Sequence, residues 1–376
     1  MKYSDNAMMA LHTLGRLPTK GIPTGMCHIM EHSVIERLAG AYPGSYENDP
    51  HGVYMAMQRN IGVCMLDQYI ADNPLTMTDR GYESGAGMNA PTEGGGSAVV
   101  DGIAIKEPED VVRHIEEFVV PRLKARIAAF SEAEAVQALI NYESQIQAVI
   151  GGGILKAPYA IFSFPSLMYT VYGYEPYFSA YALYPDVMGR LFSLQADYAE
   201  AHNRAAVKAV ARAGLPAYCR LDHDMADSRG TLCSVKSLEK LWFPHFERSI
   251  RPAADAGFAL LWHCDGNLSE MVPLLLEAGV NGFQGFQYED GMDYVKICKM
   301  APKRGGELII QAGVSVTRTL PFGKPSDVAR EMRFLVENGT RHMFLSMSSS
   351  CVPGTPYENI RAFVEGLHYY RLNGRL

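Results

Sequence analysis

The segment 258–267 ends an apolar run with side chains that could carry out chemistry. Residues 258–262 are apolar, and His263, Cys264 and Asp265 follow at once, before a Gly-Asn turn at 266–267. An apolar run of this length near glycines predicts a buried strand. A histidine and a carboxylate at its end are costly unless they pair, bind a metal ion or act in catalysis. Taken alone, Asp265 could be a turn residue and His263 could be bonded to backbone. The residues at the other strand ends therefore decide between a structural and a functional role.

Four further predicted strands also end in polar or ionisable residues. The groups are Asp222, His223 and Asp224 after 216–221; Gln284, Gln287 and Glu289 in and after 280–286; Gln311 after 307–310; and Ser346 to Cys351 after 342–345. Turn chemistry favours Gly, Asn, Asp and Ser at such places, but it does not predict two histidines and three glutamines. Because the carboxyl ends of parallel barrel strands converge on one face, these residues indicate an active site.

The elements that position these residues alternate regularly along the second half of the chain. Helical periodicity is predicted for 186–213, 237–256, 268–278, 291–301, 325–338 and 356–370, between the strands named above. Strands separated by helix-length segments imply parallel pairing with right-handed crossovers. We therefore predict an α/β fold, a (β/α)8 TIM barrel. We expect a single domain over 1–376, with a helical lead-in over 1–20 and a hairpin excursion near 71–105.

Composition narrows the class of protein. The 376 residues are 48% apolar and carry a net charge of −7, with both signs mixed along the chain, which argues against nucleic acid as a partner. The seven cysteines are scattered and form no CxxC pair, a pattern typical of the reducing cytoplasm. The sequence contains no run of about 18 apolar residues, so we expect no membrane span. The first residues contain no apolar signal segment.

The candidate residues support two kinds of chemistry. One is a zinc shell of N, S and O ligands, supplied by His263, Asp265, Glu289 and Cys351. The other is acid–base catalysis by a set of histidines and carboxylates, namely His263, Asp265, Asp222, Asp224, His223 and Glu289. The chain has no HExxH, no GxSxG elbow and no GxGxxG after a strand, so the usual zinc protease, serine hydrolase and Rossmann sites are not indicated.

Neutral side chains supply candidate substrate contacts. Gln284, Gln287 and Gln311 could orient an oxygen-bearing substrate by hydrogen bonds. The stretch 159–184 holds seven tyrosines and three phenylalanines, among them Tyr169 and Tyr172. Such a stretch either packs short helices together or forms an aromatic wall over a flat ligand.

Four motifs resemble the uroporphyrinogen decarboxylase superfamily, best over 185–371. They are residues 222–230, the turn HCDGN at 263–267, the segment GFQGFQ at 282–287, and VPGTPYENI at 352–360. The Thr-Pro-x-Glu-Asn pattern before the last helix is the most specific marker. The resemblance implies a (β/α)8 barrel and two broad activities, decarboxylation of uroporphyrinogen without a cofactor and corrinoid-dependent methyl transfer.

The chain departs from both branches. Members of the decarboxylase branch carry an N-terminal segment with closely spaced arginines, which bind the carboxylates of the substrate. The equivalent stretch of this chain, 25–32, has no arginine. Many methyltransferases of the other branch carry His-x-Cys-Gly-Asn and a second Cys, which bind a thiol-activating zinc. By this resemblance His263 matches, but Asp265 and Ser349 stand where the two cysteines would be.

An altered site fits a methyltransferase that moves a methyl group from a small donor, such as a methoxylated aromatic, to the cob(I)alamin of a separate corrinoid protein. Zinc would be an optional metal, and a homodimer is compatible with the sequence. Three alternatives stay open: a methylcobamide-to-thiol or -tetrahydrofolate methyltransferase, a uroporphyrinogen decarboxylase-like lyase, and a non-catalytic binding barrel.

Overall fold

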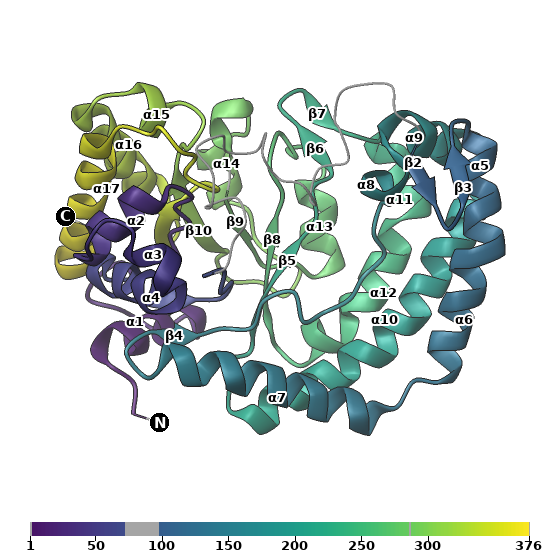
Figure 1. Ribbon diagram of the computed structural model, residues 1–376, viewed down its shortest axis with the longest axis horizontal. Coiled ribbons are helices and arrows are strands. Elements are labelled where there is room, and N and C mark those ends of the chain that lie inside the picture. Colours follow the sequence, from purple (N-terminus) through teal and green to yellow (C-terminus); the bar gives the residue numbers. More distant parts are fainter. Residues whose placement is uncertain (1, 72–97, 286, 376) are drawn as a thin grey trace.

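Parallel strands form the centre of the molecule and helices surround them (Figure 1). The computed structural model describes residues 2–71, 98–285 and 287–375. Within these residues the largest sheet has five parallel strands, in the order β11-β10-β9-β8-β5. Its strands are β5 (Tyr218–Asp222), β8 (Ala259–His263), β9 (Gly282–Gln284), β10 (Ile309–Val314) and β11 (His342–Met347).

Three further segments close this sheet into a barrel. The short strands β1 (Met65–Leu66) and β4 (Leu155–Lys156) pair with each other in parallel. Thr24 forms a parallel bridge to β11, and its carbonyl accepts hydrogen bonds from the start of β1. On the other side Tyr159, just after β4, forms a parallel bridge to β5. The five strands, β1, β4 and the segment at Thr24 therefore make the eight parallel segments of a TIM barrel, which confirms the predicted fold class.

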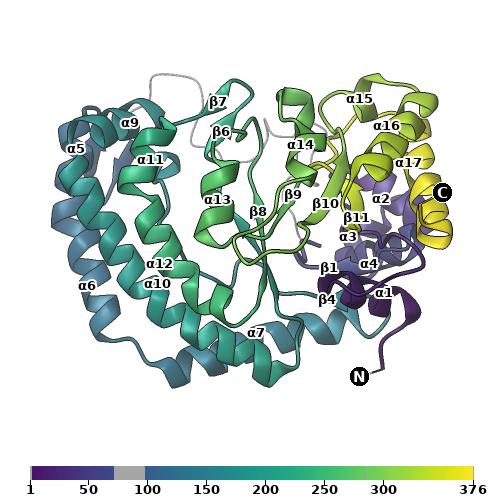
Figure 2. The same ribbon diagram turned by 180° about the vertical axis from the view of Figure 1, so that it is seen from behind.

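Helices cover the outside of the barrel, and Figure 2 shows α10 and α12 packed side by side. Proline lies in the first turn of α4, α5, α10 and α16, where its missing N–H would have had no partner. The helices are α1 (Asp5–Leu14), α2 (His32–Ala39), α3 (Ser45–Asn48), α4 (Pro50–Ile61), α5 (Pro108–His114), α6 (Val120–Ala128), α7 (Glu132–Ile150), α8 (Tyr169–Tyr172), α9 (Tyr174–Leu183), α10 (Pro185–Ala213), α11 (Val235–Leu241), α12 (Phe243–Asp255), α13 (Val272–Ala278), α14 (Tyr294–Cys298), α15 (Thr319–Phe322), α16 (Pro325–Asn338) and α17 (Tyr357–Asn373). A π-helical turn (Ile115–Val119) joins α5 to α6, and a 3-10 turn (Tyr288–Asp290) follows β9.

The barrel interior is apolar at one end and polar at the other. Alternate residues of each strand point inward. At the amino ends, Tyr218, Leu261, Ile309 and Phe344 pack together with alanines of α1, which lies at the bottom of Figure 1. At the carboxyl ends the inward positions are polar instead, so the interior opens to a polar mouth on the side opposite α1.

The predicted elements of the second half are present, with ends that shift by a few residues. α10 and α16 match their predicted ranges closely, whereas the predicted helix 237–256 is divided into α11 and α12. The hairpin excursion is represented by β2 (Ala98–Val100) and β3 (Ile103–Ile105), which pair antiparallel. Its residues 72–97 lie outside the described residues. None of the described helices is long and apolar enough to cross a membrane.

Candidate active site

One layer of inward-facing residues forms the floor of the polar mouth. The strand register places Asp222 of β5 beside His263 of β8, His263 beside Gln284 of β9, and Gln284 beside Gln311 of β10. The sequence predicted all four as site residues from their places at strand ends. Because the strands are parallel and in register, these residues form a continuous row of neighbours on the inner face of the sheet.

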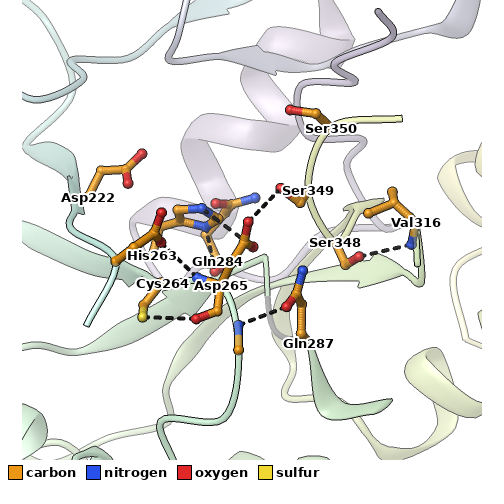
Figure 3. A network of polar contacts seen from close by, with 12 residues as sticks. Asp222, His263, Cys264, Asp265, Gln284, Gln287, Val316, Ser348, Ser349 and Ser350 are labelled. Atoms are coloured by element: carbon orange, nitrogen blue, oxygen red, sulfur yellow. Dashed lines mark hydrogen bonds and ion pairs between the residues drawn. The ribbon is translucent and has the colours of Figure 1, made fainter. Parts of the chain in front are cut away.

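The imidazole of His263 is held in one orientation. Its Nδ1 lies 3.2 Å from the backbone carbonyl of Gln284, which can only accept a hydrogen bond, so Nδ1 carries a proton. Its Nε2 therefore faces the mouth, 3.9 Å from Oδ1 of Asp265 (Figure 3). Gly285 makes this packing possible, because a Cβ at this position, where φ is +75°, would lie 2.5 Å from Nδ1.

Three carboxylates surround this imidazole, and each is held by a donor. The Tyr159 hydroxyl donates to Asp222 Oδ2 (2.7 Å), and the backbone N–H of Asp265 donates to Asp224 Oδ1 (3.0 Å). The Ser349 hydroxyl donates to Asp265 Oδ2 (3.2 Å), as Figure 3 shows. The carboxylates thus come from the ends of the neighbouring strands β5 and β8, and side chains that follow β4 and β11 brace two of them.

The charges in this cluster change the pKa values of its members. Burial lowers the pKa of His263, but the charges of Asp222 and Asp265 outweigh burial, so the net direction is upward. Burial raises the pKa of Asp265 to about 6; His263 opposes this rise and Asp224 adds to it. His263 and Asp265 therefore form a pair that can hold a proton near neutral pH.

A buried arginine lies beneath this layer. Arg220 of β5 is 3% exposed, and its Nε lies 3.0 Å from Asp67 Oδ2. Its two terminal nitrogens donate to the side-chain oxygens of Gln284 (2.7 Å) and Gln68 (2.8 Å). The guanidinium is therefore fully engaged by the barrel and is not available as a free anion-binding group.

Asp222, Asp224 and His263 could also hold a divalent cation. Among the described residues, they are the one group of three or more His, Cys, Asp or Glu whose ligand atoms all lie close together, within 4.8 Å of one another. Two carboxylates and one imidazole are a donor set that suits a divalent metal with open positions for water or substrate.

Comparisons with known proteins agree with this architecture. A family model described as uroporphyrinogen decarboxylase (URO-D) matches residues 133–370, more than half of the 376 residues. The chain belongs to the uroporphyrinogen decarboxylase family. A search of curated proteins found no match.

Two solved structures resemble this member of the uroporphyrinogen decarboxylase family. A methyltransferase from Methanosarcina mazei superposes with a TM-score of 0.59 at 14% identity, covering 98% of this chain and 99% of that chain. A putative vitamin-B12 independent methionine synthase from Listeria monocytogenes gives a TM-score of 0.43 at 12% identity, covering 94% and 96%. At 14% identity, the likeness to the Methanosarcina mazei methyltransferase shows the fold alone.

A thiolate-bound zinc does not fit the residues of this family member. The three positions that the resemblance assigns to zinc ligands do come together, as the contacts of Asp265 with His263 and Ser349 show. The two thiolate positions are occupied by a carboxylate and a hydroxyl. The nearby thiols lie elsewhere: Cys264 Sγ accepts from a backbone N–H, and Cys351 is buried beside the segment at residue 29.

Among the described residues, the predicted metal ligands His263, Asp265, Glu289 and Cys351 do not form one group, and Asp222 and Asp224 lie with His263 instead. Glu289 instead accepts hydrogen bonds from the hydroxyls of Ser315 (2.6 Å) and Thr317 (2.9 Å), outside the cluster. The 3-10 turn after β9 carries it away from His263. Cys351 pairs along the backbone with residues 28–30, so its side chain is used in packing.

Three other predicted site residues, Tyr169, Gln287 and Tyr172, form hydrogen bonds within the protein. Tyr169 donates to the backbone carbonyl of Asp224 (2.8 Å), and Gln287 accepts from the N–H of Gly266 (2.7 Å), so both brace the loops that carry the carboxylates. Tyr172 belongs to a separate network, because its hydroxyl bonds to Nδ1 of His114 (2.9 Å).

Sequence reasoning missed Asp67, Tyr159 and Arg220. Arg220 stands between Cys219 and Leu221 in an apolar context, which hid it. A signal was present, because Tyr218, Arg220 and Asp222 alternate with period two, as expected for the inward face of a barrel strand. Asp67 and Tyr159 follow strands too short to be recognised from their pattern.

His223, predicted as an acid–base group, is held neutral beside the site. Its Nε2 accepts a hydrogen bond from the backbone N–H of Leu167 (2.9 Å), which only the neutral ring allows. Burial lowers the pKa of His223 to about 4, against the opposing charges of Asp224 and Asp222. The ring therefore orders the segment around Leu167 and is not placed to move a proton.

This assignment predicts a pH-dependent stability. Because the folded pKa lies below the ordinary value of 6.5, the unfolded chain takes up the proton first as the pH falls. The contribution is complete above the ordinary pKa and is lost progressively toward pH 4. When the pH falls from about 7.5 to 5, the free energy of unfolding should decrease by about 2 kcal/mol less in His223→Gln than in the wild-type protein. Urea unfolding at the two pH values measures this difference. Equal pH dependence in both proteins would contradict it.

Proposed function

We propose that the chain is a methyltransferase that moves a methyl group from a small donor to the cob(I)alamin of a separate corrinoid protein. The charge at the mouth supports methyl transfer over decarboxylation of uroporphyrinogen. Within the part of the chain that the structure describes, the carboxylates of Asp67, Asp222, Asp224 and Asp265 accompany two cationic side chains, Arg220 and His263. An excess of negative charge repels a substrate that itself carries many carboxylates, and Arg220 is already engaged.

The same residues favour the donor half of corrinoid chemistry over the thiol half. A zinc that activates a thiol acceptor is typically held by thiolates, and here the two corresponding positions are Asp265 and Ser349. The solved methyltransferase from Methanosarcina mazei shares the fold over 98% of this chain, which is compatible with the proposal. The corrinoid is the methyl-accepting substrate, and a partner protein brings it to the mouth.

The chain's own task is to position the donor and to control its leaving group. Cob(I)alamin is itself the nucleophile, so the chain need not supply one. The atom that loses the methyl group must depart as a neutral molecule, because an alkoxide or an amide anion is a poor leaving group. The Nε2 of His263, with Asp265 beside it, is placed to donate a hydrogen bond or a proton to that atom at the mouth.

An anaerobic assay tests the proposal. The purified protein is mixed with cob(I)alamin and, in turn, with methoxybenzenes, methanol and methylamines, and methylcobalamin is followed by absorbance. Formation of methylcobalamin with one donor class is the expected result. Consumption of added methylcobalamin by a thiol or by tetrahydrofolate would instead assign the chain to the acceptor half. No reaction with free or protein-bound corrinoid would contradict the proposal and favour a lyase or a binding barrel.

A further inference from the structure

Among the described residues, no cationic side chain at the mouth is left to balance its carboxylates. Of the groups that act most strongly on His263, three are aspartates, Asp222, Asp265 and Asp224, and Arg220 is the one permanent cation. Arg220 forms an ion pair with Asp67, with its Nε 3.0 Å from Oδ2 of the carboxylate. Asp224 is exposed at the mouth, and its carboxylate has no cationic partner among the described residues. A ligand that enters here meets a negative potential that a positive charge would relieve.

An aromatic cluster stands beside the exposed carboxylate. Tyr169, Tyr174 and Phe178 have ring centroids 4.8 to 5.9 Å apart, and the Tyr169 hydroxyl donates to the backbone carbonyl of Asp224. Tyr174 is 42% exposed, so part of this cluster faces solvent. Burial raises the pKa of Tyr174, and the negative charges of Asp224 and Asp227 add to this rise.

The barrel floor adds an acceptor that no described group uses. The side-chain oxygen of Gln311 is buried without a hydrogen-bond partner, and the residue is only 1% exposed. The strand register makes Gln311 the neighbour of Gln284 on the inner face of the sheet, and Gln284 the neighbour of His263. Its amide nitrogen lies 2.7 Å from where a Cβ of Gly25 would be, so the side chain extends across the interior. A buried, unpaired oxygen costs free energy unless a ligand or water completes it.

Carboxylates, aromatic faces and a carbonyl-type oxygen are the groups that recognise an organic cation. We infer that the donor taken at this mouth is a methylated ammonium compound, with its charge near Asp222 and Asp224 and its N-methyl groups against the ring of Tyr174. This inference rests on the proposed methyl transfer and names its donor class. It differs from a neutral methoxylated aromatic, which would gain nothing from the negative charge.

The chemistry of such a donor suits the site. The electron pair of cob(I)alamin forms the new bond to the methyl carbon, the electron pair of the C–N bond stays on nitrogen, and a neutral amine leaves. No oxidant, reductant or added proton is needed. The positive charge disappears from nitrogen as a lone pair forms there, so the amine leaves without a negative charge that the site would have to stabilise.

Two isosteric probes test the inference without any corrinoid. Choline and 3,3-dimethylbutan-1-ol have the same shape and differ in the charge of one atom. Isothermal titration of the purified protein should show choline bound at least tenfold more tightly. Asp224→Asn should bring the ratio close to one, whereas Asp5→Asn, on α1 at the opposite end of the barrel, should leave it unchanged. Tyr174→Leu should weaken choline more than the alcohol, and circular dichroism confirms that each variant is folded.

The outcomes separate this inference from the proposed function. Equal affinity of the wild-type protein for the two probes, or no choline binding at millimolar concentration, overturns the donor class. If methylcobalamin then forms from methoxybenzenes, methyl transfer stands and only the donor class is wrong. A tenfold preference for choline supports the cation site even where no donor reacts with cob(I)alamin, and in that case it is methyl transfer that fails.

Discussion

Replacing His263 by alanine is expected to lower the rate of methyl transfer by about 10²–10⁴-fold at saturating donor. The imidazole is oriented by a backbone carbonyl and lies close to the carboxylate of Asp265, whose charge helps to raise the pKa of the ring. Its hydrogen bond to the departing atom strengthens as the bond to the methyl group breaks, so kcat should fall much more than KM rises. Initial rates of methylcobalamin formation over a range of donor concentrations measure both.

The matched control is His12→Ala, at the end of α1, on the amino side of the barrel. It should leave kcat and KM within about twofold of wild type, because it is far from the mouth and outside the polar layer. His263→Gln keeps a side-chain N–H donor and should recover part of the lost rate. A His263→Ala protein with unchanged turnover would remove this residue from the chemistry. In a non-catalytic binding barrel the same variant would change only ligand affinity, by a few fold.

The fold could be predicted well in one half of the chain and poorly in the other. In the second half four of the five barrel strands have five or six residues, and helix-length segments separate successive strands, as between β8 and β9. In the first half β1 and β4 have two residues each, and Thr24 joins the barrel through an isolated bridge. Segments this short have no readable period, and only their pairing with distant strands makes them part of the barrel.

The sequence could place the site residues at the ends of strands, but it could not place those in the turns that follow. Asp222, His263, Gln284 and Gln311 are last or inward residues of strands, so the register alone brings them together. Glu289 lies five positions beyond the end of β9, and its direction depends on the turn between them. The partner of a buried charge is equally hidden, since Asp67 and Arg220 are far apart in sequence and meet only in the closed barrel.

A second buried ion pair lies away from the mouth and ties helix to barrel. Lys156 of β4 and Glu143 of α7 are 1% and 3% exposed, and Nζ lies 2.7 Å from the carboxylate. Lys156 also donates to the backbone carbonyl of Ala157 (2.6 Å). α7 lies at the bottom of Figure 1. The ion pair anchors this helix to β4, the strand that follows it. A surface pair, Lys208 with Glu132 of α7 at 2.6 Å, has both side chains about half exposed.

Lys156→Met is expected to lower the free energy of unfolding by about 3–5 kcal/mol, because it leaves the carboxylate of Glu143 buried without a counter-ion. The double variant Lys156→Met with Glu143→Leu should recover most of this loss, since no charge then remains unpaired in the interior. Lys208→Met removes the same charge from the solvated pair and should cost less than about 1 kcal/mol. Urea unfolding of the four proteins measures all three values. Similar losses for Lys156→Met and Lys208→Met would show that water reaches the inner pair and that its burial does not control stability.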